Sequence, residues 1–141
     1  GFGAAEADGA KRLPMKAPAG HEPCLIPGCA AVVAVAGLSA LGRPIGETCH
    51  RPHLACALLG VGEETIVTPG LLARLLTHEA GQFKGVGDPK KFRVLLNQAD
   101  GPEALDLARE TARDVQTWLP GVRVVAAALR ETDCVKEVFV C

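Results

Sequence analysis

The chain has 141 residues, enough for one domain with a substantial core, and 48% of them are hydrophobic, which excludes disorder over most of its length. The net charge of −1 argues against a surface built mainly for nucleic acid. Aromatic residues are scarce, with four Phe, one Trp and no Tyr, so platforms that stack single-stranded nucleic acid are not expected either.

The chain carries no signal for export or membrane insertion. The apolar run 30–41 is too short to span a bilayer, and no signal peptide opens the sequence. We therefore expect a cytoplasmic protein with neither a membrane nor a nucleic acid as partner, whose six cysteines are reduced thiols or metal ligands. Because the first residue is Gly1, we expect residues 1–141 to form a single domain that is truncated at its N-terminus.

The first half of the chain predicts two strands and a helix. Residues 3–7 are small and apolar and predict a short strand, whereas the prolines within 11–28 make regular structure improbable there. Residues 31–38 form a continuous apolar run, as expected for a parallel strand covered on both faces. A turn over 42–46 precedes a short helix over 52–59.

The second half predicts a strand–helix–strand unit. Thr68 and Pro69 suit the N-cap and first position of a helix that Gly81 would end. Strands are expected over 93–97 and 122–129, joined by a long helix over 102–119. Residues 138–140 are either a last strand or the start of a longer element.

Short connections of this kind imply right-handed parallel crossovers. The predicted fold class is therefore α/β, with a mostly parallel sheet, helices on both of its faces, and the strands 31–38, 93–97 and 122–129 as neighbours.

The most informative motif follows the strand at 93–97. Asn97 and Asp100 stand at its carboxyl end, the edge at which ligands bind in open α/β sheets. An aspartate there can accept two N–H bonds from guanine, which offers N1–H beside its 2-amino group, whereas adenine does not. The string Asn-Gln-Ala-Asp is similar to the Asn-Lys-x-Asp signature of GTP-binding proteins, with Gln98 in place of lysine. The alternative is that Asp100 caps the next helix.

A second candidate site lies near the start of the chain. Glu6 and Asp8 end the first predicted strand and could hold Mg²⁺ through water. Lys11, Arg12 and Lys16 follow at once, and basic residues beside carboxylates suit a phosphate-bearing ligand. The alternative is a solvated loop of mixed charge. Lys84, in a glycine-flanked loop, is either a further phosphate contact or a solvated lysine.

Cysteine and histidine residues offer a weaker metal hypothesis. Thiolates and imidazoles suit tetrahedral Zn²⁺, but the spacing contains no clean pair of cysteines two residues apart, and buried cysteine is common in cores. The candidate zinc ligands are Cys24, Cys29, Cys49, His53 and Cys56.

Several spaced motifs resemble one family. The strings EADGAKRLPMKAPAGHEP, AVVAVAGLSALG, HRP, TPGLLARLLTHEAGQFKG and VLLNQAD occur in the order seen in the YqeC-type family, an accessory family assigned to selenium-dependent molybdenum hydroxylases. The resemblance covers most of residues 6–100. It implies a fold like that of P-loop NTPases (Rossmann-like, three-layer) and a role in maturing a molybdenum–selenium enzyme that depends on GTP, or a related nucleotide, with Mg²⁺.

One family feature is missing from this chain. No G-x-x-x-x-G-K-[ST] phosphate loop occurs in the 141 residues, so we expect the loop to lie upstream and this chain alone not to hydrolyse GTP or ATP. Two other functions stay open. The chain could be a metal- or cofactor-carrying domain that uses the cysteines and histidine, or a non-catalytic interaction scaffold with vestigial nucleotide motifs.

Overall fold

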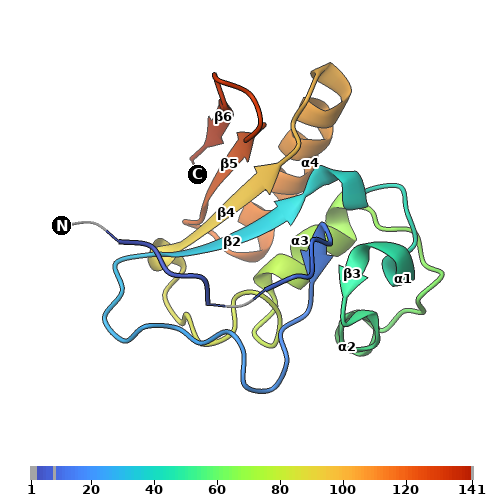
Figure 1. The fold of residues 1–141 in the computed structure, drawn as a ribbon, viewed down its shortest axis with the longest axis vertical. Coiled ribbons are helices and arrows are strands. Elements are labelled where there is room, and N and C mark those ends of the chain that lie inside the picture. Colours follow the sequence, from blue (N-terminus) through green and yellow to red (C-terminus); the bar gives the residue numbers. More distant parts are fainter. Residues whose placement is uncertain (1–2, 8, 141) are drawn as a thin grey trace.

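A four-stranded sheet forms the centre of the molecule (Figure 1). The computed structural model describes residues 3–7 and 9–140. The strands β2 (Val32–Gly37), β4 (Phe92–Asn97), β5 (Arg123–Ala127) and β6 (Val135–Phe139) lie in the order β2-β4-β5-β6. The first three are parallel and β6 is antiparallel to β5, so the predicted parallel neighbours are confirmed, and Val138 and Phe139 of the last predicted segment belong to a strand.

The helix between β4 and β5 is the crossover that the sequence predicts. This helix, α4 (Pro102–Trp118), begins at a proline, which suits the first helical position because its missing N–H has no partner there. It buries Ala108, Thr111, Ala112 and Val115, which recur at helical spacing. No helix among residues 3–7 and 9–140 is long and apolar enough to cross a membrane.

Helix α3 (Pro69–Thr77) packs against α4. The Thr68 side chain accepts a hydrogen bond from the Leu71 N–H, which confirms the predicted N-cap. The predicted end at Gly81 is wrong, because the helix stops at Thr77 and His78 is extended. Gly81 instead belongs to the tight turn that follows, where a Cβ would lie 2.1 Å from the Leu75 carbonyl oxygen.

A second, two-stranded sheet lies beside the central one. It pairs β1 (Met15–Lys16) in parallel with β3 (Cys49–His50) and carries α1 (Ile45–Thr48) and α2 (Pro52–Leu59) next to it (Figure 1). Short 3-10 turns follow β2 at Leu38–Ala40 and precede β4 at Pro89–Lys91.

Two predictions for the N-terminal region are wrong. Residues 3–7 form no strand: they are largely exposed, and the Ala7 carbonyl accepts a hydrogen bond from the Cys24 N–H in the loop that follows β1. The proline-rich stretch contains β1 because Met15 and Lys16 lie between prolines and keep their backbone groups for pairing.

The central sheet is buried on one face only. Ala34, Val94, Leu96 and Val124 point into the core, on the side where Figure 1 shows α3 and α4. The opposite face leaves Val33 and Val35 of β2 56% and 52% exposed, so the prediction of helices on both faces is wrong for the part of the chain that is described. An apolar run indicates a strand, but the run alone does not say whether its second face is covered.

Candidate functional site

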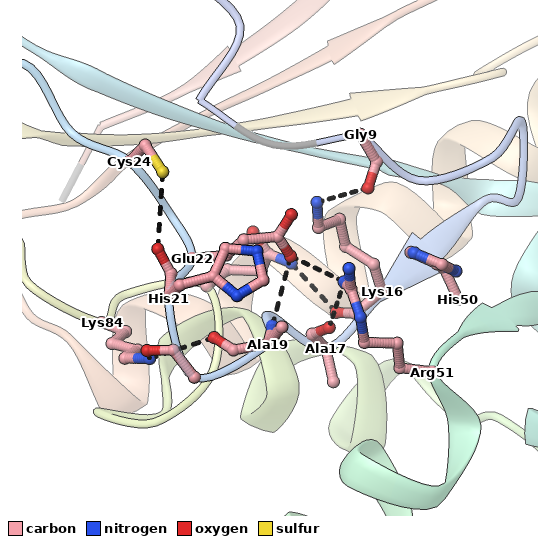
Figure 2. Close-up of polar contacts among 12 residues, drawn as sticks. Gly9, Lys16, Ala17, Ala19, His21, Glu22, Cys24, His50, Arg51 and Lys84 are labelled. Carbon is pink, nitrogen blue, oxygen red and sulfur yellow. Dashed lines mark hydrogen bonds and ion pairs between the residues drawn. The ribbon is translucent and has the colours of Figure 1, made fainter.

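A cluster of basic side chains forms where the two small strands meet the N-terminal loop (Figure 2). The parallel pairing of β1 with β3 sets Lys16 opposite His50, and Arg51 follows at once. The positive charges of Lys11, Lys16 and Arg51 all act on His50. We call Lys11, Lys16, His50 and Arg51 the basic cluster; the Glu22 carboxylate interacts with Lys16, His50 and Arg51.

Lys16 is a buried member of the cluster. Only 5% of the residue is exposed, and its ammonium donates to the Gly9 carbonyl at 2.6 Å. The Lys16 carbonyl in turn accepts a hydrogen bond from the Gln82 side chain at 2.9 Å. A buried ammonium must be compensated by acceptors or negative charge, which the Gly9 carbonyl and the charge of Glu22 supply, while the Gln82 bond holds the Lys16 backbone.

Arg51 is held on a strained backbone. It has a φ of 60°, in the left-handed region that non-glycine residues seldom adopt, where it is the N-cap of α2. Its guanidinium lies 2.6 Å from a Glu22 carboxylate oxygen and donates to the Ala17 carbonyl. The side chains of Arg51 and Glu22 are only 22% and 12% exposed, so this pair is screened less than a surface ion pair.

The charges in the cluster shift two titrating groups. Burial acts to raise the pKa of Glu22, but the Ala19 N–H and the charges of Lys16 and Arg51 lower it below its ordinary value. The pKa of His50 is lowered by burial and then by the positive charges of Arg51, Lys11 and Lys16, against a smaller opposite effect of Glu22. His50 is therefore a neutral imidazole at pH 7 beside three cations, which is an environment that favours an anion.

Lys11 and Arg12 lie in a turn at the carboxyl end of β2. Both have positive φ, 50° and 64°, and the turn closes with the Leu13 N–H on the Ala10 carbonyl. The next residue, Pro14, accepts a hydrogen bond from the Gly37 N–H at 2.7 Å. The two basic residues that the sequence suggested for phosphate are exposed and are brought to the edge of the sheet.

The Asn-Gln-Ala-Asp segment stands at the same edge. The Asn97 amide oxygen accepts from the Leu129 N–H after β5, and the Gln98 oxygen accepts from the Ser39 N–H after β2, each at 3.0 Å. Gln98 has a φ of 68° and lies against Gly37, where a Cβ would be 2.6 Å from the Gln98 oxygen. The motif thus ties together the loops that follow three parallel strands.

Asp100 does not cap α4. The N-cap is Gly101, with a φ of 96° and no side-chain hydrogen bond, so the alternative assigned to Asp100 is not what the structure contains. Asp100 is exposed, and its charge contributes to raising the pKa of Lys136, after the larger effects of Glu131 and Asp133. A solvent-facing carboxylate at this edge is available to donors of a ligand.

The predicted metal ligands do not converge. Within residues 3–7 and 9–140, no group of three or more His, Cys, Asp and Glu side chains could hold a metal ion. Burial raises the pKa of the Cys49 thiol to about 12, so it is no thiolate, while Cys24 and His53 are exposed. Glu6 is exposed and Asp8 lies outside the described residues, so their Mg²⁺ role stays a prediction.

Lys84 is not the solvated lysine of one prediction, and its contact with phosphate stays a prediction. Its ammonium donates to the carbonyls of Ala19 and Gly20, at 3.1 and 2.8 Å. It therefore fastens the loop that also carries Glu22, as Figure 2 shows.

Sequence reasoning missed the central part of the basic cluster. Glu22, His50 and Arg51 were not among the predicted site residues, although they lie in the strings HEP and HRP that carry the family resemblance. Their partnership could not be read from spacing, because 29 positions separate Glu22 from Arg51. The one local signal was Arg51, placed directly before the proline that starts a helix.

Comparison with known proteins supports the resemblance. The profile of the YqeC protein family matches residues 3–53, which hold the basic cluster. The "Uncharacterized protein YqeC" of Escherichia coli (strain K12) is 35% identical to the chain over 82 residues. That alignment covers 57% of this chain but 32% of the relative, so the chain spans about a third of the protein it matches. No solved structure matches the chain significantly.

Proposed function

We propose that this chain is the phosphate- and base-contacting part of a nucleotide-binding accessory protein of the YqeC family, with a fold related to P-loop NTPases. The observation that carries the proposal is the basic cluster, in which the positive charges of Lys11, Lys16 and Arg51 all act on His50 and the Glu22 carboxylate is paired with Arg51. The cluster lies next to the sheet edge that carries Asn97 and Asp100, since Pro14 and Gln98 both contact Gly37.

The chemistry of the cluster suits phosphate. Lysine ammonium groups and an arginine guanidinium form short, charge-assisted hydrogen bonds to phosphate oxygens. Lys11, Arg12 and Arg51 sit on left-handed backbone, a strain that proteins retain mainly at functional sites. A phosphate would also favour the protonated form of His50 and so gain a further positive charge.

The edge formed by the Asn-Gln-Ala-Asp segment suits a purine base. Asp100 is exposed, is not used as a helix cap, and can accept from two adjacent N–H groups. Guanine presents such a pair, and adenine does not. The Asn97 side-chain oxygen does not contact the base in this proposal, because it accepts a hydrogen bond from the Leu129 N–H. Asn97 instead holds the loop after β5 against the end of β4.

The role in the cell rests on the family resemblance. We propose that the nucleotide, with Mg²⁺ held near Glu6 and Asp8, drives a step in the maturation of a selenium-dependent molybdenum hydroxylase in the cytoplasm. The partner is that client enzyme or the machinery that supplies its cofactor. The chain's own residues bind and orient the nucleotide in this proposal.

Titration of the purified chain with GDP and ADP tests base recognition. We expect GDP to bind at least about tenfold more tightly than ADP. The Asp100 carboxylate would accept from the N1–H and 2-amino group of guanine, whereas adenine offers no such pair of donors and would leave the carboxylate unpaired. Asp100→Asn should reduce this preference to near unity while leaving ADP affinity unchanged. Equal affinities of the unmodified chain for the two nucleotides would remove the guanine assignment.

Phosphate binding needs a separate variant. Lys11→Ala should weaken GDP and ADP equally, by roughly tenfold, since it removes a charge-assisted contact common to both. Lys91→Ala is the matched control, because Lys91 is an exposed lysine just before the amino end of β4, the end opposite Asn97. If the two lysine variants behave alike, the basic cluster is not the phosphate site.

A further inference from the structure

The uncovered face of the central sheet carries an apolar row in strand register. Val35, Leu95, Val125 and Val138 are successive partners across β2, β4, β5 and β6, so their side chains share one face. Val35 and Val138 are each 52% exposed, and Leu95 and Val125 are partly buried. A contiguous apolar strip of this kind on a soluble domain marks an interaction surface.

A basic row lies next to the apolar row. Val33 is paired with Arg93, and Arg93 with Arg123, one pleat nearer the amino ends of the strands. The Arg93 guanidinium donates to the carbonyls of Lys90 and Phe92, so it lies near the amino end of β4, at the margin of the strip. These two rows contain two arginines and no carboxylate, and we call them the open face.

We propose that the open face is a docking site for an amphipathic α-helix of a partner protein, with acidic residues along one side of its apolar stripe. Parallel strands are rarely left bare, because their faces are normally covered by helices. Four strands spaced at about 4.8 Å span roughly 19 Å, which accommodates one or two helices of about 10 Å diameter. The opposite face already holds α3 and α4 in this way (Figure 1).

Charge decides between the occupants of the open face. A second copy of the chain has the same two arginines and no carboxylate in these rows, so stacking on it gives Arg93 and Arg123 no acidic partner from that face. A helix with glutamates beside its apolar stripe instead meets both arginines while its leucines cover Val35, Leu95 and Val125.

Two synthetic helical peptides of about 18 residues, roughly 27 Å long, provide the test. Both carry the same leucine stripe, flanked by glutamates in one peptide and by lysines in the other. Fluorescence anisotropy with the full 141-residue chain should show the glutamate peptide binding at least about tenfold more tightly. The Arg93→Glu/Arg123→Glu variant should reverse the preference, and Val35→Glu, a change at an exposed position, should weaken binding of the glutamate peptide.

The matched control changes charge equally on other surfaces. Arg113→Glu/Arg130→Glu alters the net charge by the same amount on α4 and in the loop after β5, and should keep the preference for the glutamate peptide. Equal binding of the two peptides, or no response to the arginine reversal, overturns the proposal. So does a dimer of the chain that Val35→Glu dissociates, or arginine-dependent binding to anionic phosphatidylserine vesicles without peptide binding.

Discussion

Arg51 combines a left-handed backbone with a largely buried ion pair to Glu22. Arg51→Ala and Arg51→Gly both remove the ion pair, but only glycine accepts a φ of 60° without steric cost. We therefore expect Arg51→Gly to be more stable than Arg51→Ala by about 1 kcal/mol in urea unfolding. Glycine is also better tolerated than alanine at an N-cap, which acts in the same direction.

Arg130 provides the control for this comparison. It is an exposed arginine outside the residues with positive φ, so glycine there should be no better than alanine, because glycine adds entropy to the unfolded chain. An Arg51→Ala variant as stable as Arg51→Gly would show that position 51 carries no backbone strain.

His50 should make stability depend on pH. Its folded pKa lies below the ordinary value of 6.5, so the unfolded chain takes up a proton at higher pH than the folded chain. The stability it contributes is complete above about pH 6.5 and falls as the pH drops through 6.5 toward the folded pKa. Between about pH 7.5 and 5.5, His50→Gln should therefore lose less unfolding free energy than the unmodified chain.

Two other shifted groups do not confuse this measurement. His78, whose pKa is also lowered by burial, is present in both proteins and cancels in the difference. The pKa of Glu22 is lowered from 4.5, so the stability it contributes is lost only at more acidic pH. Parallel pH profiles for the two proteins would exclude His50 as the titrating group.

At the scale of elements, Gly37 is the point where three segments meet. It ends β2, donates to the Pro14 carbonyl, and lies against the Gln98 side chain that follows β4. In Gly37→Ala the new Cβ would stand 2.6 Å from the Gln98 oxygen and 3.0 Å from the Pro14 Cβ. We expect a loss of about 1–3 kcal/mol in unfolding free energy, because the neighbours must move apart.

A second variant separates the two neighbours of Gly37. Adding Gln98→Gly should recover part of the loss, since it removes the closer atoms and suits a φ of 68°. Gly20→Ala is the control, as nothing lies within 4 Å of a Cβ there, and it should change stability by less than about 0.5 kcal/mol. Equal stabilities of Gly37→Ala and Gly20→Ala would mean that the three segments are not tightly joined.

At the scale of the whole molecule, the sheet should tolerate polar groups on one face and not on the other. Val94 is fully buried toward α3 and α4, whereas Val35 is half exposed. Val94→Thr should cost about 1–3 kcal/mol because its hydroxyl is buried away from water, and Val35→Thr less than about 0.5 kcal/mol. Similar losses from both substitutions in thermal unfolding would show that the open face is covered in solution.

The elements were largely predictable from local sequence, and their contacts were not. Pro52 and Pro102 fix helix starts, and β-branched runs such as 122–129 favour strands, because both effects act within a few residues. The end of α3 was missed because a turn follows it, in which the Ala80 N–H donates to the His78 ring and the Gln82 N–H donates to the Leu75 carbonyl of the helix. Such contacts depend on geometry that residue type alone does not fix.

The candidate site divides in the same way. Periodicity and strand polarity are local properties, so the α/β class, the parallel strand–helix–strand unit and the position of Asn97 and Asp100 at a strand's carboxyl end could be predicted without coordinates. The pairing of Arg51 with Glu22, the bonds of Lys84 to the loop that carries Glu22, and the exposure of Val35 and Val138 on one sheet face became visible only in the folded chain. Those outcomes depend on which distant segments pack together, and ion pairing and burial are properties of that packing rather than of sequence spacing.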